Sequence, residues 1–228
     1  MKNSAARSYN DGIDFFVSGK NIVVSARRGK DGRVVVTQSR KAEVKSKTDK
    51  RFKAIKTIIL LAIAMILAIV YNFLGMICGI EELQEVLLLP LMWGGTFAYY
   101  YIVAKNPATP NLSKYHAAEH KVLNYCDKYT DEILDYDKIM QMSCISIRCG
   151  STVIAVIMVF ITIMLPGVWY IPWLALKLIW IALSIIVSMY LWARGKCNFL
   201  QKMVIETPRR EEVEVAVLGM EECIRISK

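Results

Sequence analysis

The chain has 228 residues, of which 55% are hydrophobic, and its net charge at pH 7 is +9. This hydrophobic content is too high for an ordinary soluble domain, and several uncharged stretches exceed the roughly 18 residues that suffice to cross a bilayer. The sequence therefore predicts an integral membrane protein, mainly α-helical, with about four transmembrane helices.

Positive charge is concentrated in the N-terminal segment, residues 1–53, which we expect to be cytoplasmic. Residues 1–56 contain fifteen Lys and Arg against five Asp and Glu. Basic residues beside a membrane span are typical of the positive-inside rule and of contact with anionic lipid. Aromatic residues do not alternate with these basic ones as they do on a base-stacking surface. The expected partner is therefore the lipid bilayer, and no nucleic acid is expected.

Residues 21–37 predict a small β-hairpin within this N-terminal segment. Two runs rich in β-branched residues flank a turn that contains Asp31 and Gly32, the usual pattern of a tight hairpin. We expect residues 1–20 to be weakly ordered and residues 38–53 to link the hairpin to the membrane surface.

Two pairs of transmembrane helices are predicted, at residues 54–104 and 151–193. The four predicted spans are residues 54–76, 86–104, 151–165 and 173–193. The third span is short, so a re-entrant segment is an alternative to a full crossing.

The distribution of basic residues predicts the topology. They flank the spans in both terminal tails and in residues 105–150, whereas the short intervening loops lack them. This predicts a multi-pass protein of the cell membrane with both termini in the cytoplasm. Five of the six cysteines then face the cytoplasm or its boundary, where thiols stay reduced, so a disulfide framework is not expected.

Two polar segments are predicted to be cytoplasmic and helical. In residues 105–150, Pro107 and Pro110 end the second span, a first helix carries the histidines, and a second helix covers about 131–147. In residues 194–228, a helix begins near Thr207 and Pro208. Its apolar residues recur at helical spacing and are expected to pack on the 105–150 segment; they are Val213, Ala216, Val217, Met220 and Ile224.

The histidines are the strongest chemical signal in the chain. His116 and His120 are the only two histidines, and Glu119 lies beside the second. On a helix, positions i, i+3 and i+4 share one face, so two imidazoles and a carboxylate converge there. The order His-x-x-Glu-His is also the reversed zinc-protease signature. This pattern predicts a site for a divalent metal.

Three stretches resemble the YqhQ family, bacterial membrane proteins of unknown function. Residues 115–121, Tyr-His-Ala-Ala-Glu-His-Lys, resemble the family's Tyr-His-Gly-Ala-Glu-His-Lys signature. Residues 148–151 resemble the end of its His-Pro-Arg-Cys-Gly-Thr signature, and residues 206–216 resemble its C-terminal helix. The resemblance implies a metal-dependent enzyme of the bacterial inner membrane. The chain departs from the second signature at Ser146 and Ile147, so a site that used the family's histidine would be altered here.

The first functional hypothesis is a metal-dependent membrane enzyme, a hydrolase that acts at the cytoplasmic membrane surface. His116, His120 and Cys149 would bind the metal and leave one coordination position open. Histidine and cysteine are typical zinc ligands, so we expect zinc or a similar ion. Glu119 would accept a proton from water as the catalytic residue, or would itself be a ligand. A site at the bilayer surface suits a lipid-linked or membrane-embedded substrate, whose identity the sequence does not reveal.

Two alternatives remain open. One is a non-catalytic homo-oligomeric pore, transporter or sensor, in which His116, His120, Cys149 and Cys144 form a closed structural metal site. The other is that the histidines and Cys149 only pack and form hydrogen bonds, with no metal involved.

Overall fold

The computed structural model describes residues 5–17, 20–29, 31–40, 81–129 and 133–227. This part of the chain is mainly helical with a small N-terminal sheet, as the sequence predicts. The predicted span over 54–76 lies outside the described residues. The chain divides into two compact units, Met1–Gln38 with Phe97–Lys228, and Ser39–Thr96. The candidate site lies wholly in the first unit, which is described below.

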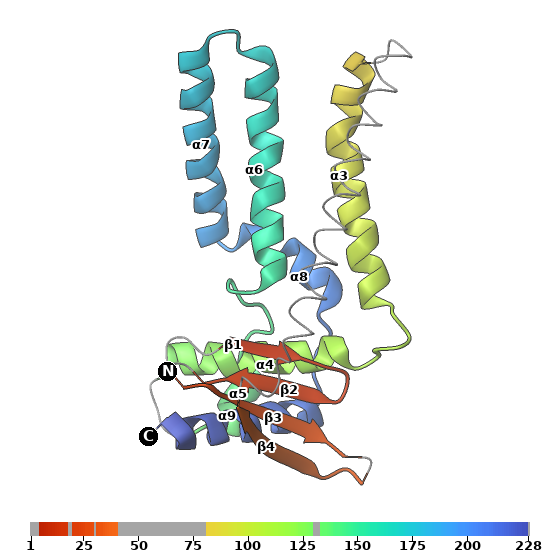
Figure 1. Ribbon diagram of the computed structural model, residues 1–228, viewed down its shortest axis with the longest axis vertical. Coiled ribbons are helices and arrows are strands. Elements are labelled where there is room, and N and C mark those ends of the chain that lie inside the picture. Colours follow the sequence, from red (N-terminus) through yellow and green to blue (C-terminus); the bar gives the residue numbers. More distant parts are fainter. Residues whose placement is uncertain (1–4, 18–19, 30, 41–80, 130–132, 228) are drawn as a thin grey trace. The chain divides into compact units, whose positions relative to one another are not determined.

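The sheet has four strands that lie side by side in sequence order (Figure 1): β1 (Ala5–Ser8), β2 (Gly12–Phe16), β3 (Ile22–Arg28) and β4 (Val34–Arg40). The predicted hairpin corresponds to β3 and β4. Its turn is held by the Gly29 N–H, which donates to the Arg33 carbonyl at 2.8 Å. Gly32 in this turn has a φ of 82°, a left-handed conformation that glycine adopts without steric cost.

The prediction of weak order over residues 1–20 is wrong for β1 and β2, which pair in antiparallel fashion with each other and, through β2, with β3. Ile13 and Phe15 of β2 are fully buried and supply the apolar contacts that order the segment. Asp14 between them is also buried, and its carboxylate accepts a hydrogen bond from Arg27 at 2.7 Å, which compensates for its burial.

Two amphipathic helices form the core with the sheet (Figure 1). Helix α4 (Leu112–Lys128) packs on α9 (Arg210–Ser227), and α9 packs on β2 and β3. The apolar residues predicted for the C-terminal helix lie in this core, as does the predicted partner segment. The approach of α9 to the sheet is close at Gly219, where an added Cβ would lie 2.8 Å from the Phe15 ring.

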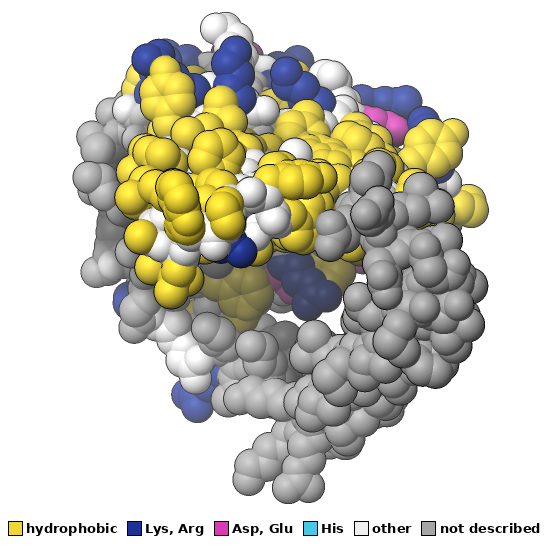
Figure 2. Space-filling view, turned by 90° about the horizontal axis from the view of Figure 1, so that it is seen from above, with side chains coloured by type: hydrophobic (Ala, Val, Ile, Leu, Met, Phe, Trp, Pro, Cys, Tyr) yellow, Lys and Arg dark blue, Asp and Glu magenta, His cyan; other side chains and the backbone are white. Residues whose placement is uncertain are grey.

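Three helices of the described chain are long and apolar enough to cross a membrane: α3 (Glu81–Ala104), α6 (Gly150–Tyr170) and α7 (Leu174–Ala193). The mean hydropathy of the apolar stretches in α6 and α7 is 2.4 and 2.2. Most large hydrophobic side chains of α7 are exposed, as a bilayer would require, whereas most of those of α6 are partly buried. Figure 2 looks down on the helix ends and shows hydrophobic side chains over much of the described surface.

Helix α6 corrects the prediction of a short third span. It continues through Pro166 and Gly167 to Tyr170, and its 21 residues extend about 31 Å, enough for a full crossing. The neighbouring helix α7 supports this continuation. The Trp180 indole N–H donates to the Ile163 carbonyl at 2.9 Å, and the Trp180 ring lies where a Cβ on Gly167 would be. Proline is tolerated in such helices when a neighbour satisfies the backbone groups nearby.

Three short elements complete the fold: α5 (Tyr136–Gln141), the 3₁₀ helix η1 (Lys196–Asn198) and α8 (Phe199–Val204). The second helix predicted in the 105–150 segment is therefore limited to α5. Residues 142–149 form an irregular loop that leads into α6.

Candidate metal centre

Helix α4 carries both histidines on one face, as their spacing predicts. The opposite face is fixed in the core by Ala118, Val122 and Tyr125. The imidazole rings of His116 and His120 lie with their centroids 4.3 Å apart. His120 is buried, with 2% of its surface exposed, whereas His116 is only partly buried. The helix thus brings two nitrogen donors together.

Cys149 supplies a third donor from the start of α6, thirty-three residues after His116 in the sequence. It is the N-cap residue of α6, so its side chain lies at the positive end of the helix dipole. Its Sγ lies 3.4 Å from Nε2 of His116 and 3.1 Å from Oγ of Ser151. Ligand atoms of the three residues all lie within 4.8 Å of one another.

This donor set fits a zinc-like ion. Bond lengths of about 2.3 Å to sulfur and 2.0–2.1 Å to nitrogen imply an N···S separation of roughly 3.5 Å in a tetrahedral site. The separation between His116 and Cys149 is 3.4 Å, close to this value. Two imidazoles and one thiolate would occupy three of the four positions and leave one open.

The orientation of His120 is fixed by a backbone carbonyl. Its Nδ1 lies 2.7 Å from the carbonyl oxygen of Cys144, and because that oxygen only accepts, Nδ1 carries the proton. The lone pair of a neutral ring is then on Nε2. A hydrogen bond from the second ring nitrogen to a carbonyl is the usual support of a metal-binding histidine.

His116 is supported by a carboxylate. Its Nδ1 lies 3.4 Å from Oε2 of Glu119, and the same oxygen accepts a hydrogen bond from the Ser8 hydroxyl of β1. Glu119 is 5% exposed. Glu119 therefore contacts the nitrogen of His116 that faces away from Cys149, which is the position of a residue that orients the ligand.

The protonation of these groups depends on their mutual contacts. Burial raises the pKa of Cys149, but hydrogen bonds with His116, His120 and Ser151 outweigh it and lower the pKa to about 5. Burial lowers the pKa of His116, but hydrogen bonds with Cys149 and Glu119 outweigh it and raise the pKa to about 10. At neutral pH the metal-free site therefore contains an imidazolium beside a thiolate.

The pKa of Glu119 is lowered. Burial raises it, but the hydrogen bond and charge of His116 outweigh that effect, and the hydrogen bond from Ser8 acts in the same direction. The carboxylate is therefore ionised at neutral pH and accepts from both neighbours.

Donors on α4 hold the loop that leads to Cys149. Lys121 is buried, and its ammonium donates to the carbonyls of Met140 and Met142, each at 2.6 Å. The Asn124 amide donates to the carbonyls of Ser143 and Ile145, each at 2.9 Å. With His120 on Cys144, the carbonyls of residues 142–145 are all bonded to α4.

Gln201 of α8 holds the next part of the loop. This side chain is 1% exposed and bonds to both backbone groups of Ser146. It also donates to Thr152 Oγ1 at 2.9 Å, in the first turn of α6. Cys149 lies between these two contacts in sequence. The Ser146 hydroxyl accepts from the Arg148 N–H at 3.3 Å, so the residue at the family's histidine position is outside the group of three donors.

The predicted residues are thus brought together in part. His116, His120 and Cys149 form the group, whereas the thiol of Cys144 does not belong to it in the described chain. Burial raises the pKa of that thiol, and Cys144 contributes its carbonyl to His120 instead. The sequence does not single out Ser8 or Gln201. The only signal for Gln201 is its polarity in a short segment after the last span.

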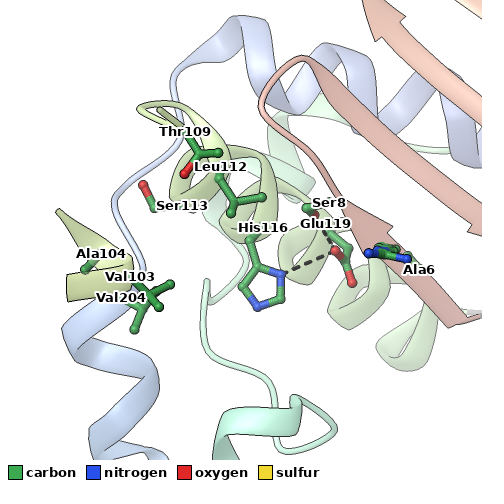
Figure 3. Close-up of a pocket in the computed structure, with 11 residues that line it drawn as sticks. Ala6, Ser8, Val103, Ala104, Thr109, Leu112, Ser113, His116, Glu119 and Val204 are labelled. Atoms are coloured by element: carbon green, nitrogen blue, oxygen red, sulfur yellow. Dashed lines mark hydrogen bonds and ion pairs between the residues drawn. The ribbon is translucent and has the colours of Figure 1, made fainter. Parts of the chain in front are cut away.

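A pocket of about 330 Å³ lies beside the group (Figure 3). His116, Glu119 and Ser8 form one side of it. The other lining residues come from the end of α3, the start of α4 and the end of α8, as well as from β1; they include Val103, Ala104, Leu112 and Val204. The site is therefore accessible from a cavity lined by both apolar and polar side chains.

Comparison with known proteins gives one match. A family model described as a protein of unknown function (DUF1385) matches residues 19–226. No curated protein matches the chain, and no solved structure does.

Proposed function

Because the chain belongs to the DUF1385 family of proteins of unknown function, we propose a function from its geometry: a metal-dependent hydrolase at the cytoplasmic surface of the cell membrane. The observation that carries the proposal is the convergence of His116, His120 and Cys149, whose ligand atoms lie within 4.8 Å of one another. The resemblance of residues 115–121 and 148–151 to the YqhQ signatures supports the same assignment.

The surrounding contacts favour a prepared site over accidental packing. His120 is oriented by the Cys144 carbonyl, and His116 is oriented by Glu119, which in turn binds Ser8. Such partners are typical of metal-binding histidines and strengthen the ligands. A bound ion of the zinc type would supply Lewis acidity and lower the pKa of coordinated water to about 7.

The chain's own residues then have distinct roles. His116, His120 and Cys149 would hold the ion, and a set of three donors would leave a position for water or substrate. Glu119 orients His116 and keeps negative charge beside it, a role that its contacts favour over direct proton transfer from water. The pocket beside His116 gives substrate a route to the site.

Elemental analysis of the full chain, purified in detergent and incubated with zinc, tests the proposal. We expect about one zinc per chain, lost in His116→Ala and in Cys149→Ala. Cys126→Ala is the matched control, since this thiol lies outside the donor group and zinc should be retained. Cys144→Ser should also retain zinc, whereas a closed four-ligand site would lose it. A wild-type chain without zinc would refute the metal site.

The contacts of His116 with Cys149 and Glu119 favour a second candidate, a cysteine nucleophile without metal. Sγ of Cys149 lies 3.4 Å from Nε2 of His116, whose Nδ1 lies 3.4 Å from Glu119. A nucleophile, a base and a carboxylate that orients the base form a catalytic triad. The first N–H groups of α6 would face the oxyanion at the helix N-terminus.

In that mechanism the Cys149 thiolate attacks a carbonyl carbon and forms a thioester as the bond to the leaving group breaks. His116 donates its proton to the leaving group. Water then hydrolyses the thioester, and the carboxylic acid and the thiol are released.

Iodoacetamide distinguishes the two candidates. A free nucleophile predicts rapid alkylation of Cys149 in the isolated protein, and slower alkylation in His116→Ala. A metal ligand predicts slow alkylation that becomes rapid only when a chelator has removed the ion. Hydrolysis that persists at full rate in metal-free protein would favour the nucleophile over the metal.

A further inference from the structure

We propose that the pocket beside His116 binds the headgroup and linkage region of an anionic membrane lipid whose hydrocarbon chains remain in the bilayer. This inference deepens the proposed function, on which it rests, because it names the class of substrate that reaches the site. It is carried by the composition, position and size of the pocket.

The apolar wall of the pocket is continuous with a candidate membrane span. Val103 and Ala104 lie at the end of α3, whose apolar stretch Leu87–Ala104 is long enough to span a bilayer. Val204 of α8 and Leu112 of α4 extend this wall. Hydrocarbon that leaves the bilayer beside α3 would therefore meet apolar side chains on its way to the site.

The other wall carries polar groups and a positive charge. Arg7 and Ser8 of β1 line it, whereas Thr109 and Ser113 lie beside Leu112 (Figure 3). Arg7 is exposed, and its guanidinium lies over the Tyr9 ring, 5.3 Å from the centroid. A guanidinium forms strong, paired hydrogen bonds with phosphate oxygens, so this wall is complementary to an anionic headgroup.

Glu119 and His116 line the pocket on the side of Ser8, so the linkage that joins headgroup to chains would lie beside the donor group (Figure 3). In the figure, the His116 ring points into the space between Val103, Val204 and Ser8. This placement matches an amphiphile that enters with its polar end toward β1 and its apolar end toward α3.

The volume of the pocket limits how much of the lipid can enter it. The pocket has a volume of about 330 Å³, near the lower end of the range of about 300–1,000 Å³ for ligand sites in proteins. It can take a compact group such as a phosphate with its glycerol linkage, whereas two acyl chains are far larger. The chains must therefore stay outside the pocket, as in a lipid drawn partly out of the leaflet.

Calorimetric titration of the zinc-loaded full chain tests the proposal, with dihexanoyl phosphatidic acid as the probe below its micellar concentration. Dihexanoylglycerol tests the need for the anion, and inorganic phosphate tests the need for the chains. We expect phosphatidic acid to bind at least tenfold more tightly than either. Equal affinity for inorganic phosphate would replace the lipid with a soluble phosphate ligand and overturn the proposal.

Two variants and a control locate the binding. Val204→Trp fills the pocket and should weaken binding of phosphatidic acid at least tenfold while zinc content is unchanged. Arg7→Gln, at an exposed position that tolerates change, should reduce the affinity toward that for dihexanoylglycerol. Ile102→Trp places the same ring on an exposed position of α3 that does not line the pocket, and should bind as wild type does.

The outcomes separate this inference from the proposed function. Unchanged affinity in both Val204→Trp and Arg7→Gln would overturn the pocket assignment whether or not zinc is bound. Binding that persists in zinc-free wild type, and is lost in Val204→Trp, would retain the lipid site even if the metal hypothesis failed.

Discussion

Gln201 holds Ser146 by both of its backbone polar groups. Its side-chain oxygen accepts from the Ser146 N–H at 2.9 Å, and its side-chain nitrogen donates to the Ser146 carbonyl at 2.7 Å. The same nitrogen donates to Thr152 at 2.9 Å. A single buried amide of α8 therefore fixes the loop on both sides of Cys149.

Replacing Gln201 should weaken metal binding without unfolding the chain. Gln201→Leu leaves the Ser146 N–H without its partner and removes one of the donors to the Ser146 carbonyl, which keeps those from Cys149 and Thr152, so Cys149 should move, and zinc affinity should fall by about 10–100-fold. Competition with a chelator measures the affinity, and the thiolate charge-transfer band of cobalt-substituted protein reports the geometry. Gln141→Leu, at an exposed position of α5, is the control. An unchanged cobalt spectrum in Gln201→Leu would show that Cys149 is positioned without the amide.

Zinc affinity should rise with pH. His116 has a pKa of about 10 and Cys149 one of about 5, so between about pH 6 and 8 the metal displaces the His116 proton but finds the thiolate already formed. Affinity should therefore increase about tenfold per pH unit, with about one proton released per zinc. Calorimetry in buffers of different ionisation enthalpy measures this proton. Affinity that does not vary with pH would exclude His116 as a ligand.

Reporter fusions should place the C-terminus in the cytoplasm. Alkaline phosphatase, which is active only outside the cytoplasm, should be inactive when fused after Lys228 and active when inserted at residues 171–173, between α6 and α7. A fluorescent protein at the same two places should give the opposite result. Activity at both places, or at neither, would contradict a full crossing by α7.

Adding a methyl group at Gly219 should destabilise the core. The new Cβ would lie 2.8 Å from the Phe15 ring, and overpacking of this kind costs about 1–3 kcal/mol. The better helix propensity of alanine offsets about 1 kcal/mol of this cost, so we expect a net decrease in the free energy of unfolding. Thermal unfolding of Gly219→Ala measures it. Gly95→Ala in α3 is the matched control, because no atom lies within 4 Å of its added Cβ; a similar loss there would contradict the packing explanation.

The sequence predicts those parts of the site that depend on local spacing. His116 and His120 share a helical face because they are four residues apart, and Cys149 follows from its place at the mouth of a span together with the YqhQ resemblance. The role of Glu119 does not follow from spacing. Its position beside the histidines is predicted, but its contact with His116 and Ser8 depends on a side-chain conformation and on a strand that the sequence does not predict.

The fold likewise has parts that the sequence predicts and parts that it does not. The hairpin has a local turn signal at Asp31 and Gly32, and the span starting at Leu174 has length and hydropathy. Strand β2 lacks such a signal, because Asp14 interrupts its apolar residues and is accommodated by contacts outside the strand, with Tyr9 and Arg27. Helix α6 continues past Pro166 beside Trp180 of another helix, which donates to the Ile163 carbonyl. Both features depend on contacts with other parts of the chain.

The loop before Cys149 is held by hydrogen bonds from side chains of α4 to the main-chain carbonyls of the loop. The exposed side chains of the loop therefore do not determine its path. Ile147 is such a side chain, with half of its surface exposed. A spectroscopic label attached at position 147 would therefore sit two residues from Cys149 on an unperturbed backbone. Its signal would change when an ion or a lipid binds at the site, and the label would not replace any of the three candidate ligands.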